Sequence, residues 1–436
     1  MNKSKENSLM EAITSLCKRR GFIFPGSEIY GGLANAWDYG PLGVELKNNI
    51  KNEWWKRFVQ NREDMVGFDS ALLMNTKVYE ASGHLAHFSD PLVECKKCHE
   101  RFREDHLDGS EICPKDKKKH ELTEAKQFNQ MLKTFLGPVE DEKNVVYFRP
   151  ETAQGIFVNF KNIVDTARKK LPFGVGQIGK AFRNEITPGN FIFRTREFEQ
   201  MEIEYFIPEP KSDSEWQGHF EAWRGEMEKW IESLGIKKDE FEQVEIPDGE
   251  RAHYSKKTID FEYKYPFGQK ELYGLAYRTN FDLTNHGLDY TEQDGSKYTP
   301  HVIEPSMGVD RSVLATLLSA YTEEADGEET RIVLKLPAKL APFKIAVFPL
   351  LKNKPELVTA AEEIYHTLKK DWACIFDDNG NVGKRYRRQD EIGTPFCITV
   401  DFDTLENGDV TVRDRDTMTQ ERIKISDLGN YFSDKL

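Results

Sequence analysis

The chain has no run of about 20 apolar residues, the length that a membrane-spanning helix needs. Its N-terminal stretch, MNKSKENSLMEAITSLCKRR, is polar and lacks the apolar core of a secretory signal peptide. It contains no internal repeat and no low-complexity tract. We therefore expect a cytoplasmic protein with no membrane partner.

Cysteine is scarce, with six residues in a chain of 436. In a cytoplasmic chain of this size so few cysteines exclude a disulfide framework. Cys17, Cys374 and Cys397 stand apart in the sequence, and we expect them to be small buried apolar residues.

The chain also has no excess of basic residues, because 61 Lys and Arg stand against 74 Asp and Glu for a net charge of -13. Affinity for nucleic acid depends largely on the neutralisation of phosphates. A nucleic-acid ligand would therefore need a local concentration of basic side chains, while the acidity elsewhere would limit non-specific binding.

The length of 436 residues, of which 38% are hydrophobic and 12% aromatic, predicts two or three domains with substantial cores. An acidic stretch over residues 323–329 has the composition of a linker. Beyond it, predicted strands at 344–349, 373–377 and 394–400 alternate with an amphipathic helix. This alternation is typical of a small α/β domain.

Residues 176–207 predict a strand, a loop and a second strand, on which Arg183 and Glu185 share one face of the first strand. On the second strand, one face carries Met201, Ile203, Tyr205 and Ile207, and the other carries Phe198, Gln200, Glu202 and Glu204. The first of these faces suits a core. The second suits a phosphate, a stacked base and an ammonium group, although a solvated face with cross-strand Arg–Glu pairs would have the same pattern.

Two motifs resemble those of the class II aminoacyl-tRNA synthetases. Phe182-Arg183-Asn184-Glu185, a loop and Arg194-Thr195-Arg196-Glu197-Phe198 resemble motif 2, and Gly308-Val309-Asp310-Arg311 before an apolar helix resembles motif 3. The flanking sequences at 149–154, 198–202 and 304–308 resemble glycyl-tRNA synthetases of the homodimeric type. The resemblance extends from about Arg20 to near the C-terminus.

This resemblance implies an α+β catalytic domain over residues 1–335, with a mostly antiparallel sheet flanked by helices and with inserts at about 90–126 and 208–300. It implies an α/β anticodon-binding domain over residues 336–436. The implied activity is glycine–tRNA ligation: glycine and ATP give glycyl-adenylate and pyrophosphate, and glycine is then transferred to the 3′ end of tRNA(Gly).

The resemblance also assigns the ATP site. Arg183 would clamp the α-phosphate and the glycine carboxylate, Arg194 would bind the terminal phosphate, and adenine would lie between Phe198 and Arg311. Arg183, Glu185 and Arg311 are the implied catalytic residues. The implied ATP-binding set is Arg183, Asn184, Glu185, Phe193, Arg194, Thr195, Arg196, Glu197, Phe198, Glu271, Leu272, Gly308, Val309, Asp310 and Arg311. Glu271 would stand beside Mg²⁺, which prefers hard oxygen ligands.

Glycine offers only an ammonium and a carboxylate group for recognition. The resemblance places Glu151, Glu202 and Glu304 around the ammonium group, an arrangement that is costly unless the cation is present. The implied glycine-binding set is Arg103, Glu151, Phe198, Glu199, Gln200, Met201, Glu202, Glu304, Pro305, Ser306, Met307 and Gly308. Arg103 would reach this site from the insert at about 90–126.

Residues 42–59 predict a long amphipathic helix that resembles motif 1, the dimer-forming element of the family. The strand expected after it, at Asp69–Met74, lacks the proline of that motif. We expect a homodimer through residues 42–75, with packing of the helix inside its own chain as the alternative.

Cys95-Lys-Lys-Cys98 and Cys113-Pro resemble parts of a zinc ribbon, in which a second Cys-x-x-Cys would place a fourth cysteine where Asp116 stands. Three thiolates could hold zinc together with Asp116, His99 or His120. A decayed site without metal is the alternative.

A basic cluster between two predicted strands resembles the tRNA-binding part of the anticodon domain. The implied tRNA-binding residues are Lys384, Arg385, Arg387, Arg388 and Arg413. A solvated helix start would have the same composition.

Two rival functions stay open at this point. A synthetase paralogue that binds ATP or tRNA without ligation is disfavoured by the intact Arg183, Phe198 and Arg311. Specificity for another small amino acid is disfavoured by the acidic set around Glu202. Pyrophosphate exchange measured across amino acids distinguishes all three functions.

Overall fold

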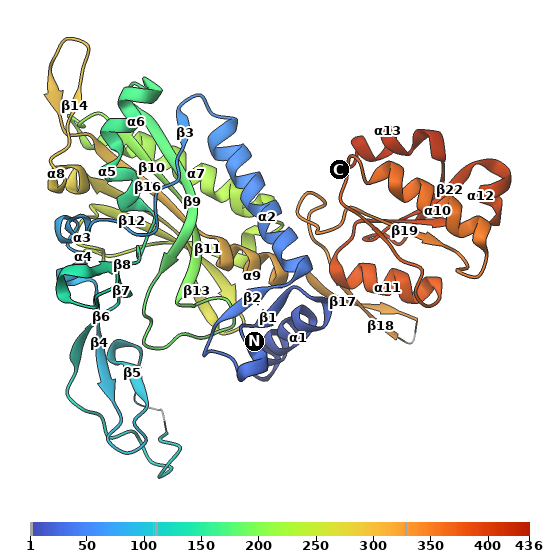
Figure 1. Cartoon of the computed structure of the whole chain (residues 1–436), viewed down its shortest axis with the longest axis horizontal. Helices are drawn as coiled ribbons and strands as arrows, with labels where there is room; N and C mark the ends of the chain where they lie inside the picture. Colours follow the sequence, from blue (N-terminus) through green and yellow to red (C-terminus); the bar gives the residue numbers. More distant parts are fainter. Residues whose placement is uncertain (1–2, 108, 110–111, 328) are drawn as a thin grey trace.

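The computed structural model describes residues 3–107, 109, 112–327 and 329–436. Figure 1 shows a large body built from the N-terminal three quarters of the chain and a smaller C-terminal body beside it. The hairpin of β17 (Tyr321–Asp326) and β18 (Glu329–Leu334) lies where the two bodies meet. In the ranges described, no helix is long and apolar enough to cross a membrane.

A seven-stranded sheet forms the centre of the large body, in the spatial order β11-β12-β13-β16-β10-β9-β3. All neighbours are antiparallel except β3 and β9, so the mostly antiparallel sheet flanked by helices is confirmed. The strands are β3 (Met65–Gly67), β9 (Phe173–Phe182), β10 (Glu197–Ile207), β11 (Phe241–Glu245), β12 (Lys257–Tyr265), β13 (Gly268–Thr279) and β16 (His301–Gly308).

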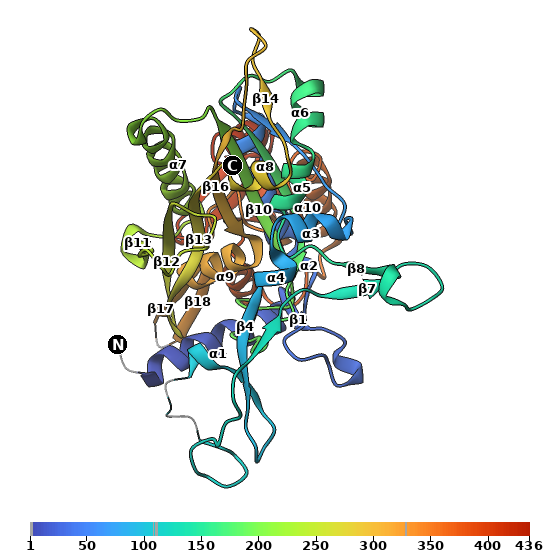
Figure 2. The ribbon, with the colours of Figure 1, turned by 90° about the vertical axis from the view of Figure 1, so that its left-hand side faces the viewer.

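Helices cover both faces of this sheet. The alternating side chains Met201, Ile203 and Tyr205 of β10 join the main core on one face, together with α2 (Pro41–Trp55), α7 (Asp213–Ser233) and α9 (Val309–Ala320). On the other face, Phe206 joins a smaller core with α5 (Ala153–Val158), α6 (Phe160–Ala167) and α8 (Phe281–Asn285). Figure 2 shows α7 and the α5–α6 pair on opposite sides of the sheet.

The N-terminal segment packs beside motif 3. It contains α1 (Lys3–Arg20), the pair β1 (Ile23–Pro25) and β2 (Trp37–Tyr39), and the short helix η1 (Glu28–Tyr30). The helix predicted at 42–59 is present as α2, which continues into a π-helical turn, η2 (Lys56–Gln60). Its residues Leu42, Leu46, Ile50 and Trp54 are buried in the main core.

A small module projects from the large body (Figure 1), and it contains the expected insert at about 90–126. Its three-stranded sheet has the order β5-β4-β6. The elements of this region are α3 (Thr76–Ala81), α4 (His84–His87), β4 (Ser89–Glu94), β5 (Arg101–Arg103), η3 (Glu104–His106) and β6 (Lys126–Asn129). The hairpin β7 (Lys133–Phe135) and β8 (Val145–Tyr147), with η4 (Glu142–Asn144) between its strands, follows. The pair β14 (Tyr290–Thr291) and β15 (Lys297–Tyr298) and the turn η5 (Lys238–Glu240) complete the large body.

The C-terminal body is an α/β domain with its own core, as the alternation of strand and helix predicts. Its sheet order is β20-β19-β21-β22-β23, with β19 parallel to β20 and β21. The strands are β19 (Ile345–Pro349), β20 (Cys374–Phe376), β21 (Phe396–Val400), β22 (Asp409–Asp414) and β23 (Gln420–Lys424). The helices are α10 (Pro355–Leu368), α11 (Val382–Ile392), α12 (Phe402–Asn407), η6 (Ile425–Asp427) and α13 (Leu428–Ser433).

Three expectations about the fold are wrong. The acidic stretch is not a linker without regular structure, because residues 323–326 lie in β17, where the buried Arg331 pairs with Glu324 at 2.8 Å and neutralises part of the charge. Arg183 and Glu185 are not strand residues, since β9 ends at Phe182. The strand that follows α2 is β3 at Met65–Gly67, so the strand expected at Asp69–Met74 is wrong. Residues 208–300, the second expected insert, supply three strands of the central sheet and helix α7.

Candidate active site

A cavity of about 520 Å³ opens over the central sheet, on the face that carries the carboxylates of β10 and β16. Strand β10 contributes Gln200 and Glu202 to its lining, and β16 contributes Glu304 and Ser306. The antiparallel register places Glu202 opposite Ser306, which brings the two strands' polar groups to one place. Glu151 enters from the turn before α5.

The acidic half of this cavity contains three glutamates with different partners. Glu202 accepts hydrogen bonds from the Ser306 hydroxyl at 2.8 Å and from the Thr152 hydroxyl. Glu151 accepts from Gln154 at 3.1 Å and lies 3.5 Å from the Nε2 atom of His84. Glu304 pairs with the guanidinium of Arg278. Each carboxylate is therefore held in position by at least one hydrogen bond or ion pair.

Arg278 is a cation that partly offsets the charge of this acidic half. Its side chain is 1% exposed, it pairs with Asp282 at 2.7 Å, and it lies over the ring of Tyr254 at 3.7 Å. One guanidinium group thus serves Asp282 and Glu304 together. Because Arg278 already pairs with two carboxylates, its positive charge does not fully neutralise Glu151 and Glu202 as well.

The pKa values reflect this shortage of positive charge. Burial and the charge of Glu151 raise the pKa of Glu202. Burial raises the pKa of Glu304 to about 8, and the charges of Glu202 and Glu151 add to the rise while Arg278 opposes it. Burial and Glu304 also raise the pKa of Glu204, whose carboxyl oxygens have no hydrogen-bond partner among the described residues. A bound cation would favour the ionised forms of these groups.

An unused acceptor also faces this half of the cavity. Gln200 is buried and lines the cavity, and its Oε1 atom has no hydrogen-bond partner within the part of the chain that the structure describes. Buried polar atoms are normally paired, and an unpaired one costs free energy. The Nε2 atom of Gln200 donates to Glu202 at 3.4 Å and to Ser306 at 3.5 Å, and the unpaired Oε1 atom on the same amide indicates that this corner binds a donor such as an ammonium group.

The other half of the cavity is basic and aromatic. Arg183, Arg194 and Arg311 line it together with Phe193 and Phe198. The guanidinium of Arg183 lies 5.4 Å from the centre of the Phe198 ring, and that of Arg311 lies 4.5 Å from the centre of the Phe193 ring. Guanidinium groups bind phosphate oxygens in pairs, and rings bind bases by stacking. This half therefore suits a nucleotide triphosphate.

Two more carboxylates meet beside Gly274 in the same cavity. Glu271 pairs with Arg311 at 2.9 Å, and Asp260 lies next to it on β12. A Cβ atom on Gly274 would lie 3.6 Å from a Glu271 oxygen and 3.8 Å from an Asp260 oxygen. Burial and the charge of Glu271 raise the pKa of Asp260 to about 7. Two such oxygen donors suit a hard divalent cation.

Comparison with known proteins agrees with this geometry. The family model of the tRNA synthetase class II core domain (G, H, P, S and T) matches residues 137–321, and that of the anticodon binding domain matches residues 344–435. Glycine–tRNA ligases of Lachnospira eligens and Alkaliphilus oremlandii are 55% and 53% identical to this chain, each over 98% of both sequences. That of Clostridium perfringens is 53% identical over 96% of this chain and 97% of its own length. The chain belongs to the glycine–tRNA ligase family.

Most residues that the family resemblance implied do line the cavity. They are Glu151, Arg183, Glu185, Phe193, Arg194, Thr195, Phe198, Glu199, Gln200, Glu202, Glu271, Leu272, Glu304, Ser306, Gly308, Asp310 and Arg311. The expected residues outside its lining, all of them in described ranges, are Arg103, Asn184, Arg196, Glu197, Met201, Pro305, Met307 and Val309.

Several of these exclusions have a direct physical reason. Met201, Met307 and Val309 are fully buried in the main core, because strand alternation turns Met201 and Met307 away from the glutamates beside them. Their side chains therefore do not face the cavity, and any contact with ligand would be through the backbone. Glu197 turns outward and pairs with Lys180. Arg196 donates to the backbone oxygen of Glu185 at 3.1 Å and so supports the motif 2 loop.

Glu199 and Asp310 lie at the edge of the cavity, but their carboxylates form ion pairs with lysines of α2. Lys47 pairs with Glu199 at 3.0 Å and with Asp310 at 3.1 Å, and Lys51 pairs with Glu199 at 2.8 Å. Asp310 also accepts a hydrogen bond from Tyr39 at 2.5 Å. These contacts tie the helix of motif 1 to the strands and helix of motifs 2 and 3, which is a positioning role.

Two of the five expected tRNA-binding residues are buried. Arg385 is 1% exposed and donates to the backbone oxygens of Pro349, Asp378 and Gly380. Arg413 is 6% exposed and pairs with Asp390 at 2.9 Å. Both arginines stabilise the C-terminal domain, so their assignment to a tRNA surface is wrong.

The sequence reasoning missed Arg278, His84 and Asp260. Arg278 has a weak signal, because it is a charged residue that follows the otherwise apolar and aromatic run Leu272–Tyr277 of β13. His84 and Asp260 have no local signal, since the placement of α4 brings His84 to a neighbouring pocket beside Glu151 and the placement of β12 brings Asp260 to the cavity.

Proposed function

We propose that this chain is a glycine–tRNA ligase, which forms glycyl-adenylate and pyrophosphate from glycine and ATP and transfers glycine to the 3′ end of tRNA(Gly). The observation that carries the proposal is that Glu151, Glu202 and Glu304 share one cavity with Arg183. The acidic half suits the ammonium group of glycine, and the basic half suits the phosphates of ATP. The reaction needs these two molecules bound side by side.

Glycine would enter with its ammonium group among the glutamates and its carboxylate towards Arg183. Glu202 and the unpaired Oε1 atom of Gln200 supply acceptors for the ammonium group. Hydrogen bonds from Ser306 and Thr152 hold the Glu202 carboxylate. A site of fixed walls rejects larger side chains by overlap, because overpacking a tight site is costly. Affinity then comes from charge, since glycine has no side chain to bind.

The activation step needs positioning more than proton transfer. A glycine carboxylate oxygen attacks the α-phosphorus of ATP, the new P–O bond forms, and the bond to the pyrophosphate oxygen breaks. The attacking carboxylate is already ionised, so no general base is required. Arg183 is suited to neutralise the charge that develops. Its Nε atom donates to the Pro150 oxygen at 3.0 Å, and its guanidinium lies 5.3 Å from the centre of the Phe88 ring and 5.4 Å from that of the Phe198 ring.

ATP would occupy the basic half, with adenine against Phe198 and Arg311 and with the terminal phosphate on Arg194. Glu185, in the motif 2 loop, is the residue that we place at the adenine or ribose end. We propose Glu271 and Asp260 as the oxygen ligands of Mg²⁺, because their carboxylates meet beside Gly274. When bound, Mg²⁺ supplies neutralisation of the triphosphate charge.

tRNA(Gly) would contact α11 of the C-terminal domain. Lys384 is exposed there, and Arg387 and Arg388 are partly exposed on the same helix. Arg388 pairs with Asp377 at 2.7 Å, so a phosphate would compete with that carboxylate. Phosphate contacts of this kind position a nucleic acid without reading its sequence. The cytoplasm is the compartment that we propose, because tRNA charging supplies translation there.

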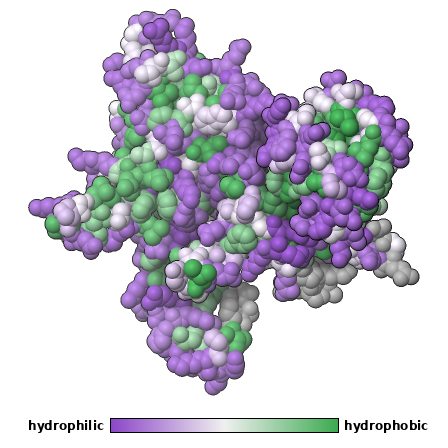
Figure 3. Space-filling model, turned by 45° about the vertical axis from the view of Figure 1, so that its right-hand side comes forward, coloured by the Kyte–Doolittle hydropathy of each residue, from purple (hydrophilic) through white to green (hydrophobic). Residues whose placement is uncertain are grey.

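A homodimer is the assembly that we propose. In residues 42–75 the apolar stripe of α2 is used within the chain, so the self-packing alternative accounts for that helix face. Apolar side chains remain exposed on two projecting loops, and they are Ile29, Tyr30, Leu33, Leu136 and Val139. Figure 2 shows the η1 loop and the β7–β8 hairpin projecting on the same side. Figure 3 shows hydrophobic patches within a mostly hydrophilic surface. A second copy would cover such patches.

Zinc is the further cofactor that we propose, as a structural ion in the projecting module. Cys95, Cys98, Cys113 and His120 offer ligand atoms that all lie within 4.8 Å of one another. Zinc prefers such sulfur and nitrogen donors.

The test is ATP–pyrophosphate exchange with glycine, alanine and serine, with the purified chain and its Glu202→Gln variant. We expect exchange with glycine alone and its loss in the variant, while ATP binding persists. The matched control is Glu226→Gln, a glutamate on the surface of α7 that pairs with Arg57. ATP binding without exchange for any amino acid would favour the non-ligating paralogue, and preferred exchange with alanine or serine would favour the other specificity.

A further inference from the structure

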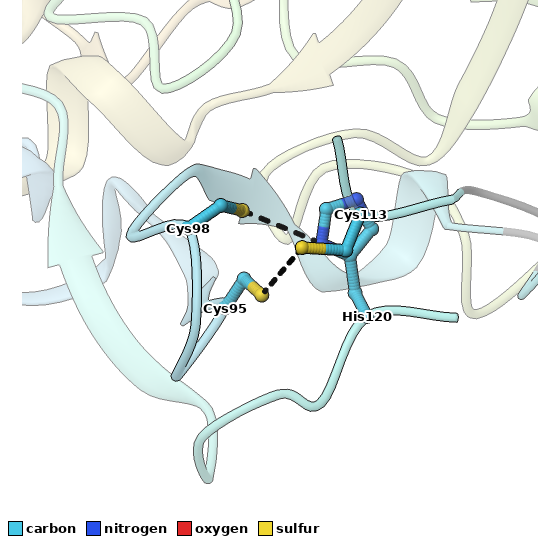
Figure 4. A group of neighbouring side chains, drawn as sticks. All are labelled: Cys95, Cys98, Cys113 and His120. Carbon is cyan, nitrogen blue, oxygen red and sulfur yellow. Dashed lines mark hydrogen bonds between the residues drawn. The ribbon is translucent and has the colours of Figure 1, made fainter. Parts of the chain in front are cut away.

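We infer that the projecting module binds one zinc ion through three thiolates and the Nδ1 atom of His120, and that Asp116 is not a ligand. The inference rests on the proposed structural zinc and goes further, because it selects the fourth ligand. Figure 4 shows His120 and the three cysteines directed to one point.

The separations between ligand atoms fit a tetrahedral ion. The Sγ atoms of Cys95 and Cys113 are 3.9 Å apart, and the Sγ atom of Cys98 is 3.7 Å from the Nδ1 atom of His120. Zn–S bonds of about 2.3 Å and Zn–N bonds of about 2.0–2.1 Å give tetrahedral edges of about 3.6–3.8 Å. The sulfur atoms are also far too distant for a disulfide, since an S–S bond is about 2.05 Å long.

The cysteines stand on two turns with the same backbone geometry. In the first turn the amide of His99 donates to the Cys95 oxygen at 2.9 Å, and in the second the amide of Lys117 donates to the Cys113 oxygen at 2.9 Å. His99 and Lys117 both have left-handed backbones, with φ of 63° and 58°. Each turn then closes by a second bond, from Cys95 to Glu100 at 2.8 Å and from Cys113 to Lys118 at 2.7 Å. Two matched turns that face each other are the usual frame of a zinc ribbon.

In this frame Asp116 occupies the position that Cys98 has in the first turn, yet its carboxylate is used elsewhere. It pairs with Lys97 at 2.7 Å and accepts from the amide of Lys118 at 3.1 Å. The Lys97 pair joins one turn to the other. Asp116 therefore links the two turns through its ion pair with Lys97.

His99 is also excluded, because its ring is 71% exposed and lies 3.0 Å from Glu94. The His120 side chain, by contrast, is 6% exposed. Its Nδ1 atom faces Cys98, and its Nε2 atom lies 3.9 Å from a Glu100 oxygen. Metal-ligating histidines commonly turn their second nitrogen towards a carboxylate, which fixes the ring.

The module is connected to the active site through Asp90. Arg103 of β5 pairs with Asp90 at 3.2 Å, and Gln130 also bonds to Asp90. The backbone oxygen of Gln130 accepts from the amide of Asn184 in motif 2 at 2.8 Å. An ion that fixes the two turns therefore fixes the strand that carries Arg103, a positioning effect on motif 2.

The test measures zinc per chain by atomic emission in the full-length protein after dialysis against a weak chelator. We expect one zinc ion in the unmodified chain, retention in the controls Asp116→Asn and His99→Asn, and loss in Cys113→Ser and His120→Asn. Replacement of zinc by Co²⁺ gives a second reading in the unmodified chain. We expect intense visible bands of a tetrahedral thiolate site in the unmodified chain, and weaker, shifted bands when His120→Asn is loaded with excess Co²⁺.

The outcomes separate the claims. Loss of zinc in Asp116→Asn with an unchanged cobalt spectrum in His120→Asn would overturn the choice of fourth ligand. Absence of bound zinc or cobalt in the unmodified chain after reconstitution would overturn the whole metal site. ATP–pyrophosphate exchange with glycine on the same samples tests the ligase separately, so a metal-free chain that exchanges normally contradicts only the zinc proposal.

Discussion

Binding of glycine to the acidic half of the cavity is predicted to release protons. Burial and the charges of Glu202 and Glu151 raise the pKa of Glu304 to about 8, against the opposing effect of Arg278. At pH 7 a group with this pKa is about nine-tenths protonated. An ammonium group placed beside it favours the carboxylate. We therefore expect glycine binding to release about 0.9 proton from this group at pH 7, with a further contribution from Glu202.

The same shift sets the pH dependence. Affinity for glycine should rise by about 0.9 log unit per pH unit near pH 7, or about 1.2 kcal/mol. The empty fold should respond in the opposite direction. Between pH 4.5 and about 8 the folded state keeps the proton of Glu304, whereas the unfolded state loses it. The contribution of Glu304 to the free energy of unfolding therefore falls as pH rises through this range. The increase in Tm caused by glycine should thus be larger at pH 8 than at pH 6.

Titration calorimetry in two buffers of different ionisation enthalpy measures the released protons directly. Glu304→Gln should reduce their number, since the amide cannot ionise. The control is Glu204→Gln, because Glu204 has a pKa raised well above its usual value and does not line the cavity. A heat of binding that is the same in both buffers would show that Arg278 already keeps Glu304 ionised, and would refute the reasoning.

Three further predictions concern arginines, a lysine and Glu204. Arg183→Lys should lower kcat for glycine activation about 10²–10³-fold, or about 2.7–4 kcal/mol, because the planar fork is lost while charge is kept. Arg62→Lys, an arginine 4.5 Å over the Trp223 ring outside the cavity, should leave the rate unchanged; equal rates for both variants in pyrophosphate exchange would remove Arg183 from the reaction. Arg385→Ala should lower the Tm of the C-terminal domain, since three backbone oxygens lose their donor. Lys384→Ala, by contrast, should weaken aminoacylation and reduce its salt dependence, while Tm and glycine activation stay unchanged. Calorimetry and charging assays check this pair, and a destabilised Lys384→Ala would contradict it. Glu204→Gln should leave glycine activation and Tm nearly unchanged at pH 7, because a protonated carboxyl and an amide are both neutral, and a large loss of either would mean that Glu204 is ionised.

The short motifs are sufficient to locate much of the candidate site from the sequence alone. Phe198, Gln200 and Glu202 are alternate residues of one strand, so the period of two already places them on one face. The fold brings these three residues together with Arg183, Glu304 and Arg311 around one cavity. Local geometry is sufficient for Phe198, Gln200 and Glu202 because these three residues lie on a single strand.

Neutralising partners could not be predicted in this way. Arg278 reaches Glu304 because β13 and β16 pair in a particular register, and Asp260 meets Glu271 because β12 lies beside β13. The raised pKa of Glu304 follows from that arrangement of charges. The periodicity of residues within one strand carries no information about the register of that strand with another strand.

The sequence by itself determined the alternation of residues along β10, the two-part organisation of the chain and the residue types that phosphate and ammonium groups require. The tertiary structure decided which members of each chemical type face a ligand. It turned Arg385 and Arg413 inward while Lys384 stayed exposed, and it chose His120 over Asp116 beside the cysteines. The physical reason is that residues of the same type have the same charge and donors everywhere in a sequence. Only the burial of each side chain, and the partner that contacts it in the folded chain, distinguish a structural role from a functional one.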